Sequence, residues 1–273
     1  MTEFLSPIEK KFADPLTIWN DLRDRIQQQN IKRFADVVDE FLQALWALDR
    51  YRIEGVAPPG MGKIGADNNK QLAGAYRAKG LWFGEILSLL LVNQTTKPLA
   101  PRSNVQGFSQ VHQIDIAWPA QREPIEDPLV CVETKVMGAP AFGSTPARGA
   151  TSDWSNRRKE LKFQATDLKL YRRRHETRID HWDNWRRAAP PAVYFIWCAR
   201  LGPKDNFDSM LAELRELTDT YLDGAAVIAF RENAGGNGYE PVTMTQRHRR
   251  LTVDDVLHRI ADQINDLSTP HDN

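Results

Sequence analysis

Two short hydrophobic runs, each close to a proline and each carrying charged residues, constrain this chain more than any other feature. The runs are 113–117 (QIDIA) and 130–136 (VCVETKV). Their β-branched residues are typical of short, buried strands. Because side chains alternate between the two faces of a strand, Glu133 and Lys135 are expected on one face. A buried charge is costly unless it is paired or binds a metal, so these strands predict a functional site.

The upstream run adds a second carboxylate, Asp115. Regular alternation places Ile114 and Ile116 on one face of this strand and Asp115 on the other. Hard oxygen ligands from Asp and Glu hold Mg²⁺, which lowers the pKa of a bound water and neutralises charge on a phosphate. A nearby lysine orients the water and stabilises the developing charge. The combination predicts metal-assisted hydrolysis of a phosphodiester.

An Asp on one strand and Glu-x-Lys on the next resembles the PD-(D/E)XK nuclease superfamily, which includes most Type II restriction endonucleases. The matching residues are Asp115, Glu133 and Lys135, with Ile114 where the fullest motif has proline. The resemblance implies an α/β fold with a restriction-endonuclease-like core, in which helices flank a mixed central β-sheet. It also implies Mg²⁺-dependent, sequence-specific cleavage of double-stranded DNA, as in a restriction-modification system. The alternative is a surface hairpin with an exposed Glu133–Lys135 pair.

A long proline-free segment, 68–93, predicts a helix with Asp67 as its N-cap. Glu85 lies in the most apolar part of this helix, beside Leu81 and Leu89 at helical spacing. In many members of the superfamily, a Glu from the first core helix completes the metal site, so the resemblance implies Asp115, Glu133 and Glu85 as metal ligands. Equally, Glu85 could lie at the rim of the helix and reach solvent.

Positive charge is concentrated after the second strand, although the whole chain has 36 basic and 36 acidic residues. The segment 148–200 contains thirteen Lys and Arg against six Asp and Glu, interleaved with aromatic residues. Such a segment is typical of proteins that bind nucleic acids. For any single arginine, the alternative is a position on a solvated, charge-rich helix. The residues expected to contact DNA are Arg148, Arg157, Arg158, Arg172, Arg173 and Arg174.

Breaks in the pattern predict the organisation of the chain. A helical N-terminal lobe (1–55) ends at a Gly/Pro-rich segment, the nuclease-like core covers 66–267, and a disordered tail follows (268–273). Within the core, the later elements are expected to be helix 156–174, strand 193–199, helix 207–222, strand 225–230 and helix 253–267.

Three further expectations concern the cellular compartment, the oligomeric state and the alternative functions of the protein. Cys131 and Cys198 lie in apolar runs without metal-ligand spacing, and no segment has the pattern of a signal peptide or a membrane span, which together predict a cytoplasmic protein. One catalytic set per chain predicts a homodimer for double-strand cleavage, with the lobe 1–55 contributing to its interface, although docking onto the core would use the lobe's apolar residues equally well. Two alternatives to a restriction enzyme remain: an inactive DNA-binding protein with the same fold, and a repair nuclease.

Overall fold

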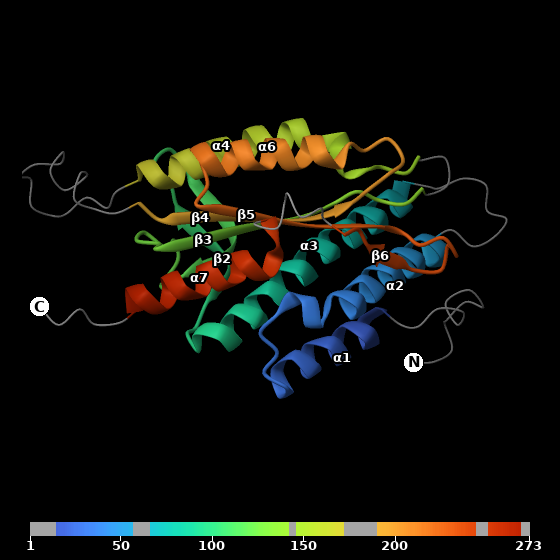
Figure 1. Ribbon diagram of the computed structural model, residues 1–273, viewed down its shortest axis with the longest axis horizontal. Coiled ribbons are helices and arrows are strands. Elements are labelled where there is room, and N and C mark those ends of the chain that lie inside the picture. The colour runs from blue at the N-terminus through green and yellow to red at the C-terminus, as the bar shows by residue number, and fades with distance from the viewer. Residues whose placement is uncertain (1–14, 57–65, 142–145, 172–189, 244–250, 269–273) are drawn as a thin grey trace, which may run out of the picture.

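The computed structural model describes residues 15–56, 66–141, 146–171, 190–243 and 251–268. A central β-sheet lies between two layers of helices (Figure 1). This arrangement confirms an α/β fold with a mixed sheet flanked by helices.

The sheet has six strands in sequential order. Its three central strands run parallel to one another, and the remaining pairs are antiparallel. Parallel strands covered on both faces are usually continuous apolar runs, as the fully buried β4 and nearly fully buried β5 are here. The strands are β1 (Ala100–Gln106), β2 (Val111–Trp118), β3 (Val130–Met137), β4 (Ala192–Arg200), β5 (Gly224–Glu232) and β6 (Tyr239–Pro241).

Helices cover both faces of the sheet (Figure 1). Helices α4 (Trp154–Leu170) and α6 (Phe207–Thr220) form the first layer. The second layer contains α1 (Pro15–Gln28), α2 (Val38–Val56), α3 (Ala66–Thr95) and α7 (Val253–Ser268). Short 3-10 helices cover Phe34–Asp36 and Ala150–Asp153.

The N-terminal helices share one hydrophobic core with the sheet. The rings of Phe34, Phe41 and Phe83 lie 5.4 to 6.0 Å apart, and Trp19 of α1 stacks on Trp82 of α3 at 4.7 Å. Buried residues of α1, α2, α3 and α7 belong to the same apolar cluster as the sheet face they cover. Phe34, Phe41, Leu45 and Trp46, large apolar residues of the predicted N-terminal lobe, are therefore used in packing within the chain.

The opposite face of the sheet has its own core. Trp154 of α4 stacks on Trp197 of β4 at 4.3 Å, and leucines of α4 and α6 fill the space around them. Both cysteines are buried and carry free thiols, as expected from their apolar runs. None of the helices in the described ranges has the length and apolar character to cross a membrane.

Candidate functional site

Strand β3 carries two of the predicted residues on one face, as its alternation predicts. Glu133 is 7% exposed, and its Oε1 accepts from the Lys135 ammonium in a short ion pair. Val132 lies on the α3 side of the sheet and Cys131 on the α4 side, so Glu133 and Lys135 project toward α4. In the part of the chain that the structure describes, Glu133 Oε2 is buried with no hydrogen-bond partner. A surface hairpin is therefore excluded.

The environment of Glu133 changes its acidity. The pKa of this carboxyl is raised to about 7. Burial is the largest cause and raises the pKa; the neighbouring Lys135 ammonium lowers it, and the Asp115 carboxylate raises it. A carboxylate that is costly to ionise in its dry site and that feels the charge of a second carboxylate is typical of functional sites.

The strand around Asp115 is irregular, which corrects the predicted alternation. Ile114 packs in the apolar cluster of the α4 side, whereas Ile116 packs in the cluster of the α3 side. On the neighbouring strand, Arg102 has a positive φ of 48° and no pairing partner in the register, which passes from Pro101–Ile116 to Ser103–Ile114. Both strands therefore depart from regular β geometry at the level of Asp115.

Asp115 fills the gap where β2 and β3 separate. The β2–β3 register extends from Trp118–Val130 to Ile116–Val132 and stops there. Beyond it, Asp115 Oδ2 accepts hydrogen bonds from the backbone N–H and the hydroxyl of Thr134, each at 2.8 Å. The carboxylate thus replaces the main-chain partner that β3 would otherwise have at this level.

Helix α3 faces this gap with Gly84 and not with Glu85. A Cβ added to Gly84 would lie 3.5 Å from Thr134 Oγ1 and 3.8 Å from Asp115 Cβ. Glu85 is half-buried and forms an ion pair with Arg23 of α1, with Oε1 2.7 Å from Nε. The structure therefore does not bring Glu85 together with Asp115 and Glu133.

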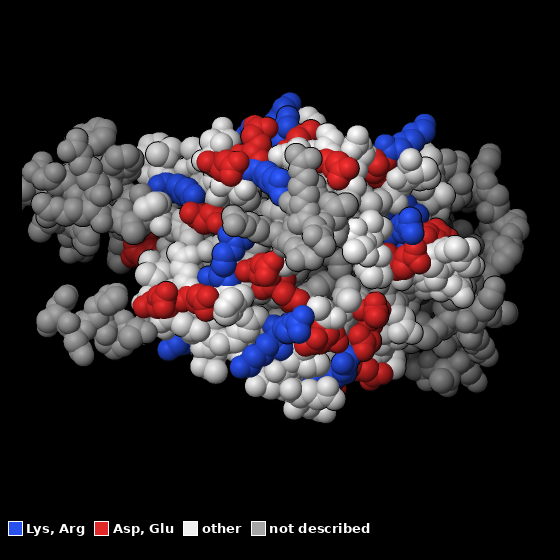
Figure 2. Space-filling view, in the orientation of Figure 1, with Lys and Arg blue, Asp and Glu red and all other residues white. Residues whose placement is uncertain are grey.

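A cleft of about 730 Å³ opens beside Asp115, and cations dominate its charged lining. On the face shown in Figure 2, by contrast, basic and acidic side chains are interspersed. Three of the basic residues were not predicted, because they belong to no motif: Arg77 and Lys79 of α3 and Arg102 of β1. The six basic residues of the lining are Arg77, Lys79, Arg102, Lys135, Arg148 and Arg157, against the acidic Asp115 and Asp153. We call this the basic cleft.

A smaller cavity of about 190 Å³ lies on the α4 side of the same strand. Glu133 lines this cavity, whereas Asp115 lines the basic cleft. Lys135 and Arg157 line both. The Glu133–Lys135 pair is therefore accessible from the cavity, and Lys135 also from the cleft. His112 at the cavity wall bonds through Nε2 to Asp167 at 2.8 Å and is a buried, hydrogen-bonded histidine.

The predicted DNA-binding arginines have different surroundings. Arg148 is exposed beside the basic cleft, and its backbone forms a two-way bridge with Ala139 at 2.8 Å in each direction. Arg157 lines the cleft but pairs with Asp153 and Glu160 of its own segment, at 3.1 and 2.5 Å. Arg158 instead pairs with Glu213 of α6 at 2.7 Å, away from the cleft. Arg172, Arg173 and Arg174 lie outside the described residues.

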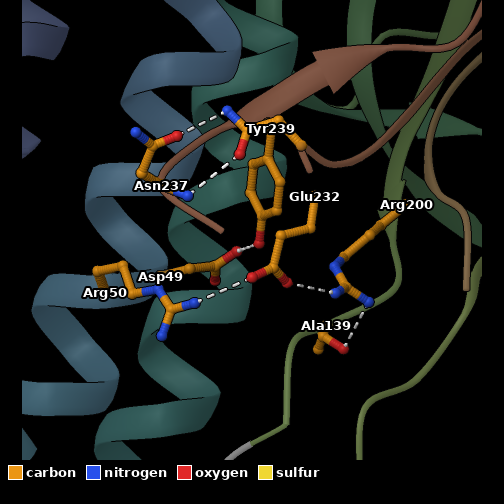
Figure 3. Close-up of polar contacts among 8 residues, drawn as sticks. Asp49, Arg50, Ala139, Arg200, Glu232, Asn237 and Tyr239 are labelled. Atoms are coloured by element: carbon orange, nitrogen blue, oxygen red, sulfur yellow. Dashed lines mark hydrogen bonds and ion pairs between the residues drawn. The ribbon is translucent and has the colours of Figure 1, made fainter. Parts of the chain in front are cut away.

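A polar network, part of which Figure 3 shows, contacts two residues of the cleft lining, Lys79 and Ala139. Asp49 of α2 accepts from the Lys79 ammonium at 2.5 Å and from the Tyr239 hydroxyl at 2.7 Å. The side chains of Asp49 and Lys79 are each only 4% exposed. Burial, and next the Asp49 carboxylate, raises the pKa of Tyr239 well above its usual range. Lys79 is thus held by the N-terminal helices while it lines the cleft.

The network continues to the end of β3. Arg200 at the end of β4 lies 3.5 Å from Glu232 of β5 and donates to the carbonyl of Ala139 at 3.4 Å (Figure 3). Gly138, with a positive φ of 93°, approaches so closely that an added Cβ would lie 2.7 Å from Arg200 Cβ. Arg200 therefore contacts the turn that follows β3 at both Gly138 and Ala139.

The residues fit a magnesium ion better than a fully protein-bound metal. Within the described ranges, no group of three or more His, Cys, Asp or Glu is placed to hold a metal. Mg²⁺ commonly uses one or two carboxylates and keeps several waters, which suits Asp115 together with Glu133 and its unpartnered buried oxygen. Comparison of the chain with protein-family models, with curated proteins and with solved structures finds no match.

Proposed function

We propose that this protein is a Mg²⁺-dependent endonuclease of the PD-(D/E)XK class that cleaves double-stranded DNA in the manner of Type II restriction enzymes. One observation carries the proposal: Asp115 and Lys135, on two adjacent strands, line a cleft with six cations and two carboxylates, and Lys135 pairs with the buried Glu133 of the adjoining cavity. The sheet order, with β3 central and helices on both faces, is compatible with a restriction-endonuclease-like core.

Each residue of the set has a separate role. Asp115 and Glu133 would hold the ion, which when bound supplies positive charge and a more acidic water. Lys135 reaches both the cleft and the smaller cavity, so its ammonium can orient the attacking water and stabilise charge on the phosphate oxygens.

The basic cleft binds the DNA backbone. Arginine donates a planar pair of hydrogen bonds that matches the phosphate group, and lysine acts as a point charge. The cleft presents four arginines from α3, β1, α4 and the bridge at Arg148, so several phosphates can be contacted at once. We further propose a homodimer, because one set of residues per chain cuts one strand at a time.

The nature of the products tests the proposal. The protein is incubated with a panel of plasmids and Mg²⁺, and the ends are mapped. Discrete fragments with reproducible ends are expected of a site-specific endonuclease, and progressive shortening from ends indicates a repair nuclease. DNA binding without any cleavage in Mg²⁺ or Mn²⁺ would favour the inactive DNA-binding alternative.

Two neighbouring arginines distinguish cleft contacts from surface charge. Arg157→Ala should weaken DNA affinity and reduce the slope of log affinity against log salt by about one, because one phosphate contact is lost. Arg158→Ala is the matched control, since Arg158 does not line the cleft and its guanidinium pairs with Glu213 of α6. It should leave both quantities close to wild type. Affinities measured by fluorescence anisotropy over a salt series provide the check, and equal effects of the two variants would contradict the assigned DNA contact.

The raised pKa of Glu133 predicts that metal binding depends on pH. Below about pH 7 the carboxyl is protonated in the metal-free protein, and the proton must leave before the ion binds. Affinity for Mg²⁺ should therefore fall about tenfold between roughly pH 8 and pH 6. Titration calorimetry at both pH values measures it, with Glu133→Gln expected to bind weakly at each. Equal affinity of the wild-type protein at the two pH values would contradict the role of Glu133.

A further inference from the structure

We propose that Thr134, the middle residue of Glu-Thr-Lys, is the positioning residue that sets the orientation of the Asp115 carboxylate for the metal. The inference rests on the proposed function. Thr134 donates twice to the same oxygen, Asp115 Oδ2, from its backbone N–H and from its hydroxyl, each at 2.8 Å. Two donors on one oxygen leave Oδ1 as the oxygen available to a cation.

Asp115 depends on these bonds more than a residue in a regular strand would. The β2–β3 register stops at Ile116–Val132, and the alternation of faces is broken at Asp115. Ladder hydrogen bonds between the two strands therefore do not hold the side chain in place. The only hydrogen bonds that reach the Asp115 carboxylate from described residues are those from Thr134. The orientation of one carboxylate thus rests on one hydroxyl and one amide.

The surroundings hold Thr134 in turn. Thr134 is 2% exposed, and helix α3 packs against it at Gly84, where an added Cβ would lie at ordinary contact distance, 3.5 Å, from Oγ1. The hydroxyl therefore lies in a closely packed and dry position, where a hydrogen bond to a carboxylate is strong. Partners that orient a metal-binding carboxylate typically change metal affinity by about 10- to 100-fold when removed.

The test is the binding of Mn²⁺ without DNA, measured from the electron paramagnetic resonance signal of the free ion. Thr134→Val keeps the shape of the side chain and the backbone donor but removes the hydroxyl. It should bind Mn²⁺ about 10- to 100-fold more weakly, and Thr134→Ser, which keeps the hydroxyl, should remain within about threefold of wild type. Thr134→Ala provides the same comparison if the valine variant does not fold.

Two further measurements separate a positioning role from general damage. The thermal midpoint without metal should differ little between the Val and Ser variants, while their Mn²⁺ affinities differ. The cleavage rate of the Val variant at low Mg²⁺ should recover when Mg²⁺ is raised, with its affinity for DNA unchanged. Equal Mn²⁺ affinity of wild type and the Val variant would overturn the inference and leave the proposed function intact. Failure of the wild-type protein to bind Mn²⁺ would count against the proposed function itself.

Discussion

Lys135→Ala is expected to lower the rate of DNA cleavage by about 10²- to 10³-fold or more while DNA affinity stays close to wild type. The ammonium lies between the Glu133 carboxylate and the basic cleft, so its loss removes the group that stabilises charge at the reacting phosphate. Five other cations line the cleft, which is why binding should survive. Single-turnover cleavage and anisotropy measured on the same preparation separate the two quantities.

A control lysine is available on the α4 layer. Lys162 pairs with Glu216 of α6 at 3.4 Å and does not line the cleft or the smaller cavity. Lys162→Ala should therefore cleave DNA at nearly the wild-type rate. Wild-type cleavage by the Lys135→Ala variant would rule out its assigned role, whereas equal losses in the two variants would indicate a general effect of charge.

Asp49→Asn should destabilise the folded protein by about 3–5 kcal/mol, the usual cost of removing one member of a buried ion pair. Asp49 and Lys79 are each 4% exposed, and Asn cannot neutralise the Lys79 ammonium. The Tyr239 hydroxyl, which donates to the same carboxylate, keeps only a neutral acceptor. Urea unfolding followed by tryptophan fluorescence and circular dichroism measures the change in the free energy of unfolding.

An exposed ion pair supplies the control. Arg231 and Glu240 pair at 2.8 Å with side chains 64% and 40% exposed, so Glu240→Gln should change stability by about 1 kcal/mol or less. Adding Lys79→Met to Asp49→Asn removes the remaining buried charge and should recover part of the loss. A cost at Asp49 no larger than that at Glu240 would show that the buried pair is hydrated or dispensable.

The central strands are predictable because buried strands consist mainly of apolar residues, which can be seen in the sequence. β3 and β4 are almost continuous apolar runs, and Glu133 and Lys135 stand out as the charged residues within β3. Strand β1 carries no such signal. It is an edge strand that contains Pro101 and mostly polar residues. Pairing with β2, and not a local sequence pattern, makes this segment a strand. The predicted helix 156–174 corresponds to α4, which begins at Trp154 without a side-chain cap bond and already ends at Leu170.

The details of the site could not be read from periodicity. The prediction from alternation assumes a regular strand. Because the strands are irregular at Asp115 and Arg102, Ile114 packs on the α4 side of the sheet and Ile116 on the α3 side. Neighbouring helix positions differ by about 100° in direction, so the apolar stripe alone does not decide whether Gly84 or Glu85 faces the strands. The structure shows that Gly84 is the position that contacts Thr134 and Asp115.

The basic residues of the cleft also could not be predicted from local sequence patterns, because they come from distant parts of the chain. Arg77, Arg102 and Arg148 are isolated in the sequence and meet only through the fold. The clustered Arg157 and Arg158 are equivalent in the sequence, and the structure separates them because adjacent helix positions face the cleft and α6 respectively.

Cleavage of supercoiled plasmid DNA as a function of Mg²⁺, by the wild-type protein beside Asp115→Asn, tests the nuclease proposal most directly. Asn has nearly the shape of Asp and can still accept from Thr134, but it lacks the charge that holds the ion. We predict Mg²⁺-dependent conversion to linear DNA by the wild type, none with chelator, and a loss of at least about 10²-fold in the variant. Equal cleavage by the two proteins, or cleavage that persists in chelator, would contradict the account.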